Sequence, residues 1–156
     1  MVLPLAALPD ILFFRSSSMK LRFGVFMQKK KALSVFIVDD NEITKLLLRL
    51  MAKDESYMVI GDAGNAKVAK ERIRQLRPDI VFLDVVLPDS DGLDLLRWIR
   101  STVPESVVLM VTACRDMEIY KAAMDIGACG FISKPFNPAI VLDTLEQVRE
   151  KVNIGP

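Results

Sequence analysis

The sequence predicts an α/β fold in which a five-stranded parallel sheet is covered by helices on both faces. From Ala32 onward, short apolar runs and longer amphipathic segments alternate five times, which is typical of repeated strand–helix units. The run at 80–83 is continuously apolar, as expected of a strand buried on both faces. Acidic residues directly follow two of the runs, at 39–40 and at 84. The carboxyl ends of parallel strands are where open α/β folds bind ligands.

Each element is assigned from its pattern, in chain order. The strands are predicted at 33–38, 57–63, 80–83, 107–112 and 131–133. The helices follow them at 41–54, 66–76, 91–101, 116–126 and 137–152. Pro78 lies after the second helix, Gly127 is the expected C-cap of the fourth, and Asn137 with Pro138 begins the fifth. Right-handed crossovers then give strand order 2-1-3-4-5, the flavodoxin-like arrangement, with its switch point between the first and third strands.

The spacing of apolar residues describes the faces of three helices. One face of helix 41–54 carries Ile43, Leu46, Leu47, Leu50 and Met51. The inward face of helix 116–126 is predicted to consist of Ile119, Ala122, Ala123 and Ile126. The inward face of the last helix is predicted to consist of Val141, Leu145, Val148 and Val152. Helix 116–126 has a second apolar stripe, which is either a partner site or scattered surface apolarity; it consists of Met117, Tyr120 and Met124.

Length and composition fit one globular domain. The chain has 156 residues, of which 51% are hydrophobic and 26% charged. Its formal net charge of +1 gives no electrostatic reason to expect direct nucleic acid binding. The absence of histidine excludes a Ser-His-Asp triad and histidine metal sites. Cys114 and Cys129 form no CxxC pair, and we interpret them as reduced core residues of a cytoplasmic protein.

Residues 1–31 differ from the rest of the chain and are interpreted as an N-terminal extension or arm. The apolar stretch 1–14 is interrupted by two prolines and an aspartate. It is too short for a membrane span, and it lacks the leading positive charge of a secretory signal. Two interpretations remain open. Met19 and Met27 are alternative starts that would make the segment an upstream extension, whereas a genuine arm would pack on the domain or mediate association.

Several functional groups are expected to meet at the carboxyl edge of the sheet. The first strand ends in Asp39 and Asp40, the third in Asp84 and the fourth in Thr112, and the fifth leads into Lys134. Neighbouring carboxylates repel one another, so unless one is protonated they need a cation. Oxygen ligands favour a hard ion, Mg²⁺ or alternatively Mn²⁺. With a lysine and a hydroxyl beside it, this site would suit phosphoryl transfer onto Asp84.

Each of these residues also has a plain structural alternative. Asp84 by itself could be a helix N-cap or a turn residue, and Asp39 with Asp40 could merely cap the first helix. Thr112 could be an ordinary hydroxyl at a strand end. These alternatives weaken when the residues are considered together.

The chain resembles the response regulator receiver domain of two-component signalling over residues 33–153, which places a receiver domain at 32–154. The motifs that carry the resemblance are Val38-Asp39-Asp40, Leu83-Asp84 with Leu87-Pro88 and Asp91-Gly92, Val111-Thr112-Ala113, Gly127-Ala128 and Lys134-Pro135-Phe136. Their order and separations make the resemblance specific.

The resemblance implies a phosphoacceptor, a metal site and a switch. Asp84 would receive a phosphoryl group from a sensor histidine kinase or a histidine phosphotransfer protein. Asp39 and Asp40 would hold Mg²⁺ together with Asp84 and the backbone carbonyl of Val86. Thr112 and Phe131 match the hydroxyl and aromatic positions of the family's switch. The bond between Lys134 and Pro135 is usually cis in this family, which would aim the lysine into the site.

The expected function is that of a stand-alone response regulator, a signalling switch and not an enzyme. It would signal to a downstream protein target through the face formed by helix 116–126, strand 131–133 and helix 137–152, or form a homodimer through helix 116–126. Neither Val86 nor Cys114 could orient a hydrolytic water, so self-dephosphorylation should be slow. The alternatives are a receiver fragment of a larger regulator and an aspartate-nucleophile phosphatase, which would need an aspartate at position 86.

Overall fold

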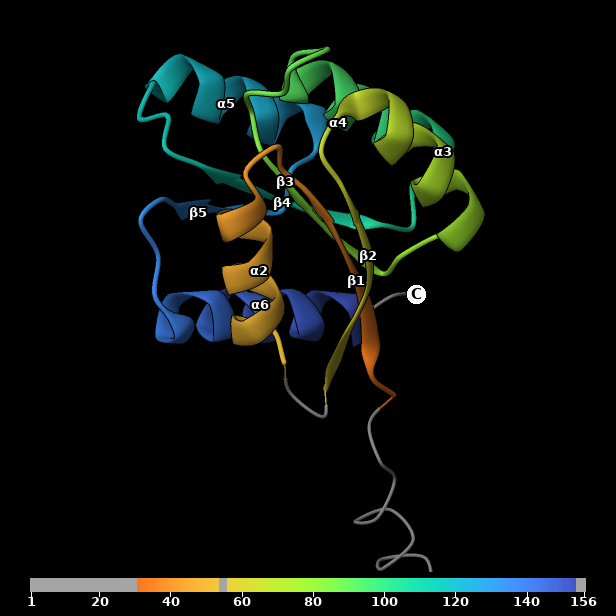
Figure 1. The fold of residues 1–156 in the computed structure, drawn as a ribbon, viewed down its shortest axis with the longest axis vertical. Helices are drawn as coiled ribbons and strands as arrows, with labels where there is room; N and C mark the ends of the chain where they lie inside the picture. The colour runs from red at the N-terminus through yellow and green to blue at the C-terminus, as the bar shows by residue number, and fades with distance from the viewer. Residues whose placement is uncertain (1–30, 54–55, 154–156) are drawn as a thin grey trace, which may run out of the picture. The chain divides into compact units, whose positions relative to one another are not determined.

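The computed structural model describes residues 31–53 and 56–153. Five strands form one parallel sheet of order β2-β1-β3-β4-β5, as predicted (Figure 1). The strands are β1 (Leu33–Val38), β2 (Tyr57–Ala63), β3 (Ile80–Leu83), β4 (Val107–Thr112) and β5 (Gly130–Ser133). The predicted extension at 1–31 lies outside the described residues apart from Lys31, so the extension and its boundary remain predictions.

In the described part of the chain, five helices alternate with the strands and cover both faces of the sheet. They are α2 (Glu42–Met51), α3 (Ala66–Leu76), α4 (Gly92–Thr102), α5 (Met117–Ile126) and α6 (Pro138–Asn153). Helices α2 and α6 pack on one face and α3, α4 and α5 on the other (Figure 1). Gly127 ends α5 in the left-handed region at φ 119°, as its predicted role requires. Among the described residues, no helix has the length and apolarity that a membrane crossing requires.

Side chains of alternate strand residues pack into two separate hydrophobic cores, one on each face of the sheet. In β1, Phe36 and Val38 point to the side of α3–α5, whereas Val35 and Ile37 point to the side of α2 and α6. All four residues of β3 are fully buried, because this central strand has helices on both faces. The strand therefore holds the residue that follows it, Asp84, on a rigid support.

The predicted inward faces of α5 and α6 are confirmed. Ala123 of α5 is fully buried, and its other predicted inward residues pack against the same core. Val141, Leu145 and Val148 of α6 are buried on the opposite side of the sheet, with Val152 packed against them. The second apolar stripe of α5 is exposed, as the prediction of two separate faces required.

Helix α2 turns four of the five residues of its predicted apolar face toward solvent, whereas the fifth, Met51, packs against the core. An exposed row, named here the α2 stripe, consists of Ile43, Leu46, Leu47 and Leu50, each 40–69% exposed. The residues that α2 buries are Lys45 and Leu48. The lysine is tolerated there because its ammonium lies 2.6 Å from Glu42 and 3.2 Å from Asp62 of β2. An amphipathic helix would ordinarily turn its apolar side to the core, so this stripe needs another explanation.

Asp62 connects β2 to helices on both faces of the sheet. Its carboxylate accepts from Lys45 and forms an ion pair with Arg49, both on α2. Its backbone oxygen accepts from Arg72 of α3 at 2.8 Å. One position on β2 thus contacts three cationic side chains.

Candidate functional site

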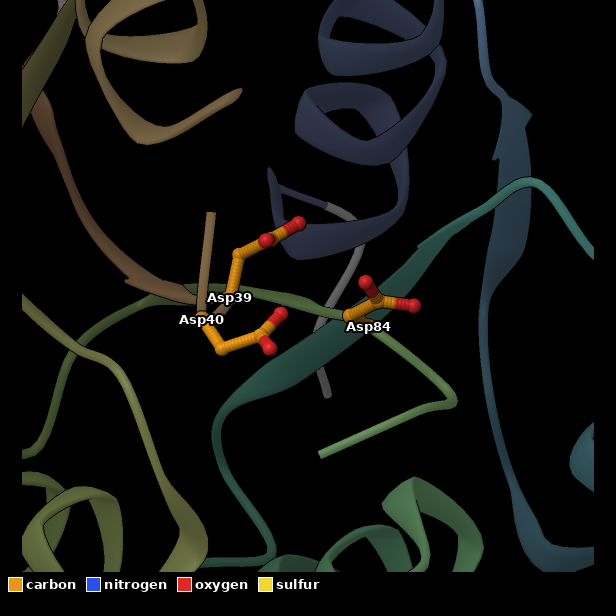
Figure 2. A group of neighbouring side chains, drawn as sticks. All are labelled: Asp39, Asp40 and Asp84. Carbon is orange, nitrogen blue, oxygen red and sulfur yellow. The ribbon is translucent and has the colours of Figure 1, made fainter. Parts of the chain in front are cut away.

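Three carboxylates meet where β1 and β3 end. Asp39 follows β1, and Asp84 extends β3, since its N–H donates to the carbonyl of Val38 at 2.9 Å. One carboxylate oxygen from each of Asp39, Asp40 and Asp84 lies within 4.8 Å of the other two. Figure 2 shows the three side chains gathered at this point. Asp39 and Asp84 are buried, whereas Asp40 is exposed. The predicted gathering of acidic residues is therefore present.

Lys134 joins two of these carboxylates. Its Nζ lies 2.6 Å from Asp39 Oδ2 and 2.7 Å from Asp84 Oδ2. The peptide bond between Lys134 and Pro135 is cis, as expected. Burial raises the pKa of Asp39 above its ordinary value, although its hydrogen bonds with Lys134 and Asn41 act in the opposite direction. Burial acts to lower the pKa of Lys134, but the hydrogen bonds to Asp39 and Asp84 together with the attraction of their negative charges raise that pKa above its ordinary value.

The donor set fits a hard cation. One oxygen of Asp39 accepts from the N–H of Asn41 at 2.8 Å, and one oxygen of Asp84 accepts from the N–H of Val86 at 3.3 Å. Lys134 contacts Asp39 and Asp84, and among the ion pairs of the described residues none involves Asp40, so negative charge remains at the rim. Oxygen ligands around such a charge suit an ion of the Mg²⁺ or Ca²⁺ type better than a soft metal.

The loop between β3 and α4 is folded tightly against Asp84. The N–H of Gly92 donates to the carbonyl of Val85 at 2.7 Å, and Val86 forms an antiparallel bridge with Asp91. A Cβ at position 92 would overlap the backbone oxygen of Asp84 and lie 2.7 Å from the Cα of Val85. Glycine is therefore required there by the close approach of two backbone segments. Val86 itself is exposed at the surface of the loop.

Thr112 and Phe131 border a cavity of about 320 Å³ at the ends of β4 and β5, under the start of α5. Thr112 is buried at the end of β4, next to β3, and its Oγ1 accepts from the N–H of Cys114 at 3.1 Å. Phe131 is half-buried on β5, with its ring centroid 4.4 Å from that of Tyr120 on α5. The cavity, the hydroxyl of Thr112 and the tilted contact between the Phe131 and Tyr120 rings therefore lie together. Cys114 and Cys129 are half-buried and form no disulfide.

The sequence-based prediction missed one residue that organises this region. Asp89 accepts hydrogen bonds from the N–H groups of Ala66 at 2.8 Å and Lys67 at 3.0 Å, at the start of α3. These two hydrogen bonds lower the pKa of Asp89. Its partners are more than twenty positions earlier in the chain, so no local pattern could have revealed the contact.

Comparison with known proteins identifies the family. The response regulator receiver domain matches residues 35–146. Protein CcdB of Bacillus subtilis is 33% identical over 114 residues, covering 73% of this chain and 95% of the relative. The chemotaxis protein CheY of Thermotoga maritima is 32% identical with the same coverage. The crystal structure of the response regulator domain of Thermotoga maritima CheB matches with a TM-score of 0.71 at 25% identity, covering 81% of this chain and 100% of that one.

Proposed function

The chain belongs to the response regulator receiver domain family, and we propose that Asp84 is the residue on which it accepts a phosphoryl group. A receiver domain is a signalling switch and not an enzyme, and it implies a histidine kinase as partner. The observation that carries the proposal is the contact of Lys134 with both Asp39 and Asp84. A half-buried lysine between two carboxylates supplies a cation at the point where a transferred phosphoryl group would add negative charge.

Asp39, Asp40, Asp84 and the backbone carbonyl of Val86 would hold Mg²⁺, with Mn²⁺ as an alternative. The ion would neutralise charge on the phosphoryl oxygens during transfer. A carboxylate oxygen of Asp84 attacks phosphorus while the bond from phosphorus to the donor's imidazole nitrogen breaks, with its electron pair leaving on nitrogen. Lys134 and the hydroxyl of Thr112 each donate to a phosphoryl oxygen.

The transferred group would act on the cavity beside Thr112. An inward movement of Thr112 toward the phosphoryl oxygens would open more of this space to Phe131. Because the Phe131 ring contacts the ring of Tyr120, its movement would disturb the exposed stripe of α5. This couples a local charge to the surface formed by α5, β5 and α6, where a downstream protein or a second copy would bind.

The α2 stripe supports an approach route for the phosphodonor. Helix α2 begins at Glu42, two positions after Asp40, so the stripe starts at the rim of the acidic site. Its residues follow the i, i+3, i+4, i+7 spacing with which one helix packs along another. A helical kinase or phosphotransfer partner that covered the stripe would bring its phosphohistidine to Asp84.

We further propose that the regulator acts alone and in the cytoplasm. The coverage of the CcdB and CheY relatives over 95% of their length supports the first point, and the two unpaired thiols fit the second. A receiver piece of a larger regulator is the alternative. An aspartate-nucleophile phosphatase is disfavoured because Val86 occupies the position where that mechanism needs a second acid.

The proposal is tested by incubating the protein with acetyl phosphate and Mg²⁺ and measuring its intact mass. We expect the wild type to gain one phosphoryl group, and we expect no gain in Asp84→Asn or when EDTA removes the metal. Failure of the wild type to gain mass would overturn the proposal, and so would an equal gain in Asp84→Asn.

A further inference from the structure

We propose that Asp89 positions the metal-binding rim by fastening the β3–α4 loop to the first turn of α3. The inference rests on the proposed function, because it concerns the loop that carries the carbonyl of Val86. Asp89 lies at the tip of this loop, between Val86 and Asp91, which pair with each other. Both of its carboxylate oxygens accept backbone N–H groups of α3, from Ala66 and Lys67.

The start of α3 offers N–H donors that suit such a carboxylate. The first N–H groups of a helix have no partner within the helix, and the helix dipole favours a negative charge there. Two side chains accept hydrogen bonds from the first N–H groups of α3. Asn65 accepts from the N–H of Val68 at 2.9 Å, which is an ordinary local cap, whereas Asp89 takes the two N–H groups before it. Of these two side chains, Asp89 is the one that connects this helix end to the loop beside Asp84.

The loop has a second anchor of a different kind. The side chain of Leu87 is buried in the core under α3–α5, and the N–H of Gly92 closes the loop on the carbonyl of Val85, but neither of these is a hydrogen bond from the tip of the loop to a helix. Two charge-assisted hydrogen bonds to a rigid helix end are directional. Asp89 therefore fixes the orientation of the peptide groups between Asp84 and Gly92, and with them the direction of the Val86 carbonyl.

Loss of this contact should weaken metal binding more than it harms the fold. Partners that orient the ligands of a metal typically change its affinity by about 10-fold to 100-fold when they are removed. Because Asp89 would orient only one ligand out of four, we expect the lower end, a loss of roughly 10-fold in Mn²⁺ affinity for Asp89→Ala.

The test compares Asp89→Ala, Asp89→Asn and Asn65→Ala with the wild type. Mn²⁺ binding is measured from the electron paramagnetic resonance signal of free Mn²⁺, at neutral pH and at a temperature where circular dichroism shows each variant folded. Asn65→Ala is the matched control, since it removes a cap from the same helix turn without touching the loop. We expect both alanine variants to melt earlier, but only Asp89→Ala to bind Mn²⁺ about 10-fold more weakly. Asp89→Asn keeps one acceptor oxygen and should fall between Asp89→Ala and the wild type.

Each other outcome contradicts the proposal in a recognisable way. Unchanged affinity in Asp89→Ala would make Asp89 a helix cap and nothing more. An equal loss in Asn65→Ala would show that any damage to the start of α3 suffices, which overturns the role of the loop contact. If the wild type bound no Mn²⁺, the metal site of the proposed function would be contradicted. The role of Asp89 in positioning that site would then be contradicted as well. If Asp89→Ala did not fold, Asp89→Asn would carry the same comparison.

Discussion

The ammonium of Lys134 lies 2.7 Å from Oδ2 of Asp84, although the two residues are 50 positions apart in the chain. The same ammonium contacts Asp39, so a single cation neutralises part of a cluster that holds three carboxylates. Asp40 is the exposed member of that cluster. The site is therefore built for a ligand that brings positive charge, and it should cost the protein stability when no such ligand is present.

Asp40→Asn should stabilise the metal-free protein. Carboxylate oxygens in the cluster lie within 4.8 Å of one another, and removing one charge at this distance relieves about 1 kcal/mol of repulsion in a largely aqueous setting. The free energy of unfolding in urea should rise in EDTA, while the additional stabilisation by Mg²⁺ should shrink. Asp125→Asn, at an exposed position of α5, is the control and should change neither quantity. A destabilised Asp40→Asn in EDTA would contradict the expectation.

Gly92→Ala should be strongly destabilising. The new Cβ would overlap the backbone of Asp84 and Val85, and forced overlap of this kind costs about 1–3 kcal/mol. Gly64→Ala provides the control, because the nearest heavy atoms to a Cβ there lie 4.0 Å away. Urea denaturation should show a large loss for position 92 and a change within about 0.5 kcal/mol for position 64. Similar losses at both positions would argue against a specific clash.

Tyr120→Glu or Met124→Glu should weaken binding of the downstream partner or self-association while phosphorylation stays intact. Both side chains belong to the exposed stripe of α5, and a charge there would have to be desolvated in any apolar contact. Sedimentation velocity of the phosphorylated and unphosphorylated forms measures self-association, and intact mass verifies phosphorylation. If both variants bound as well as the wild type, the exposed stripe of α5 would not be the surface for the partner or for self-association.

Val86→Asn should not slow the decay of the phosphorylated protein. Val86 is 67% exposed beside Asp84, and its side chain has no group that could orient a hydrolytic water. Decay of the wild type should already be slow, which mass spectrometry over time after removal of the phosphodonor would measure. A marked further slowing in Val86→Asn would refute this explanation of the lifetime.

Leu46→Glu and Leu50→Glu should impair transfer from a phosphohistidine donor but not from acetyl phosphate. Both leucines lie in the α2 stripe, and the loss of a central apolar contact in an interface typically weakens binding by roughly 10-fold or more. Val68→Glu on α3 is the control, since it alters an exposed apolar residue on the other side of the sheet. Transfer kinetics with a cognate kinase or phosphotransfer protein provide the measurement. Equal rates in all three variants would contradict a donor surface on α2.

The alternation of strands and helices, and the residues at the strand ends, could be predicted because both follow from local patterns. Asp84 directly follows a continuous apolar run, and parallel topology alone brings it to Asp39. The orientation of α2 could not be predicted, because its spacing shows which residues share a side but not which side packs on the sheet. That choice depends on Asp62 of β2, which supplies a partner for the buried Lys45. The contact of Asp89 with α3 likewise joins residues distant in the chain.

The cluster of cations around Asp62 also bears on how two copies could meet. Strands β2 and β5 lie at the two ends of the described sheet, where unpaired backbone groups could template another chain. Asp62 of β2 contacts Lys45, Arg49 and Arg72, and β5 has only four residues. Charged and short edge strands both discourage sheet-to-sheet extension. Within the described residues, two molecules would therefore associate through their helices. The sheet of each copy would then remain separate, and phosphorylation of one copy would act on that copy's own sheet.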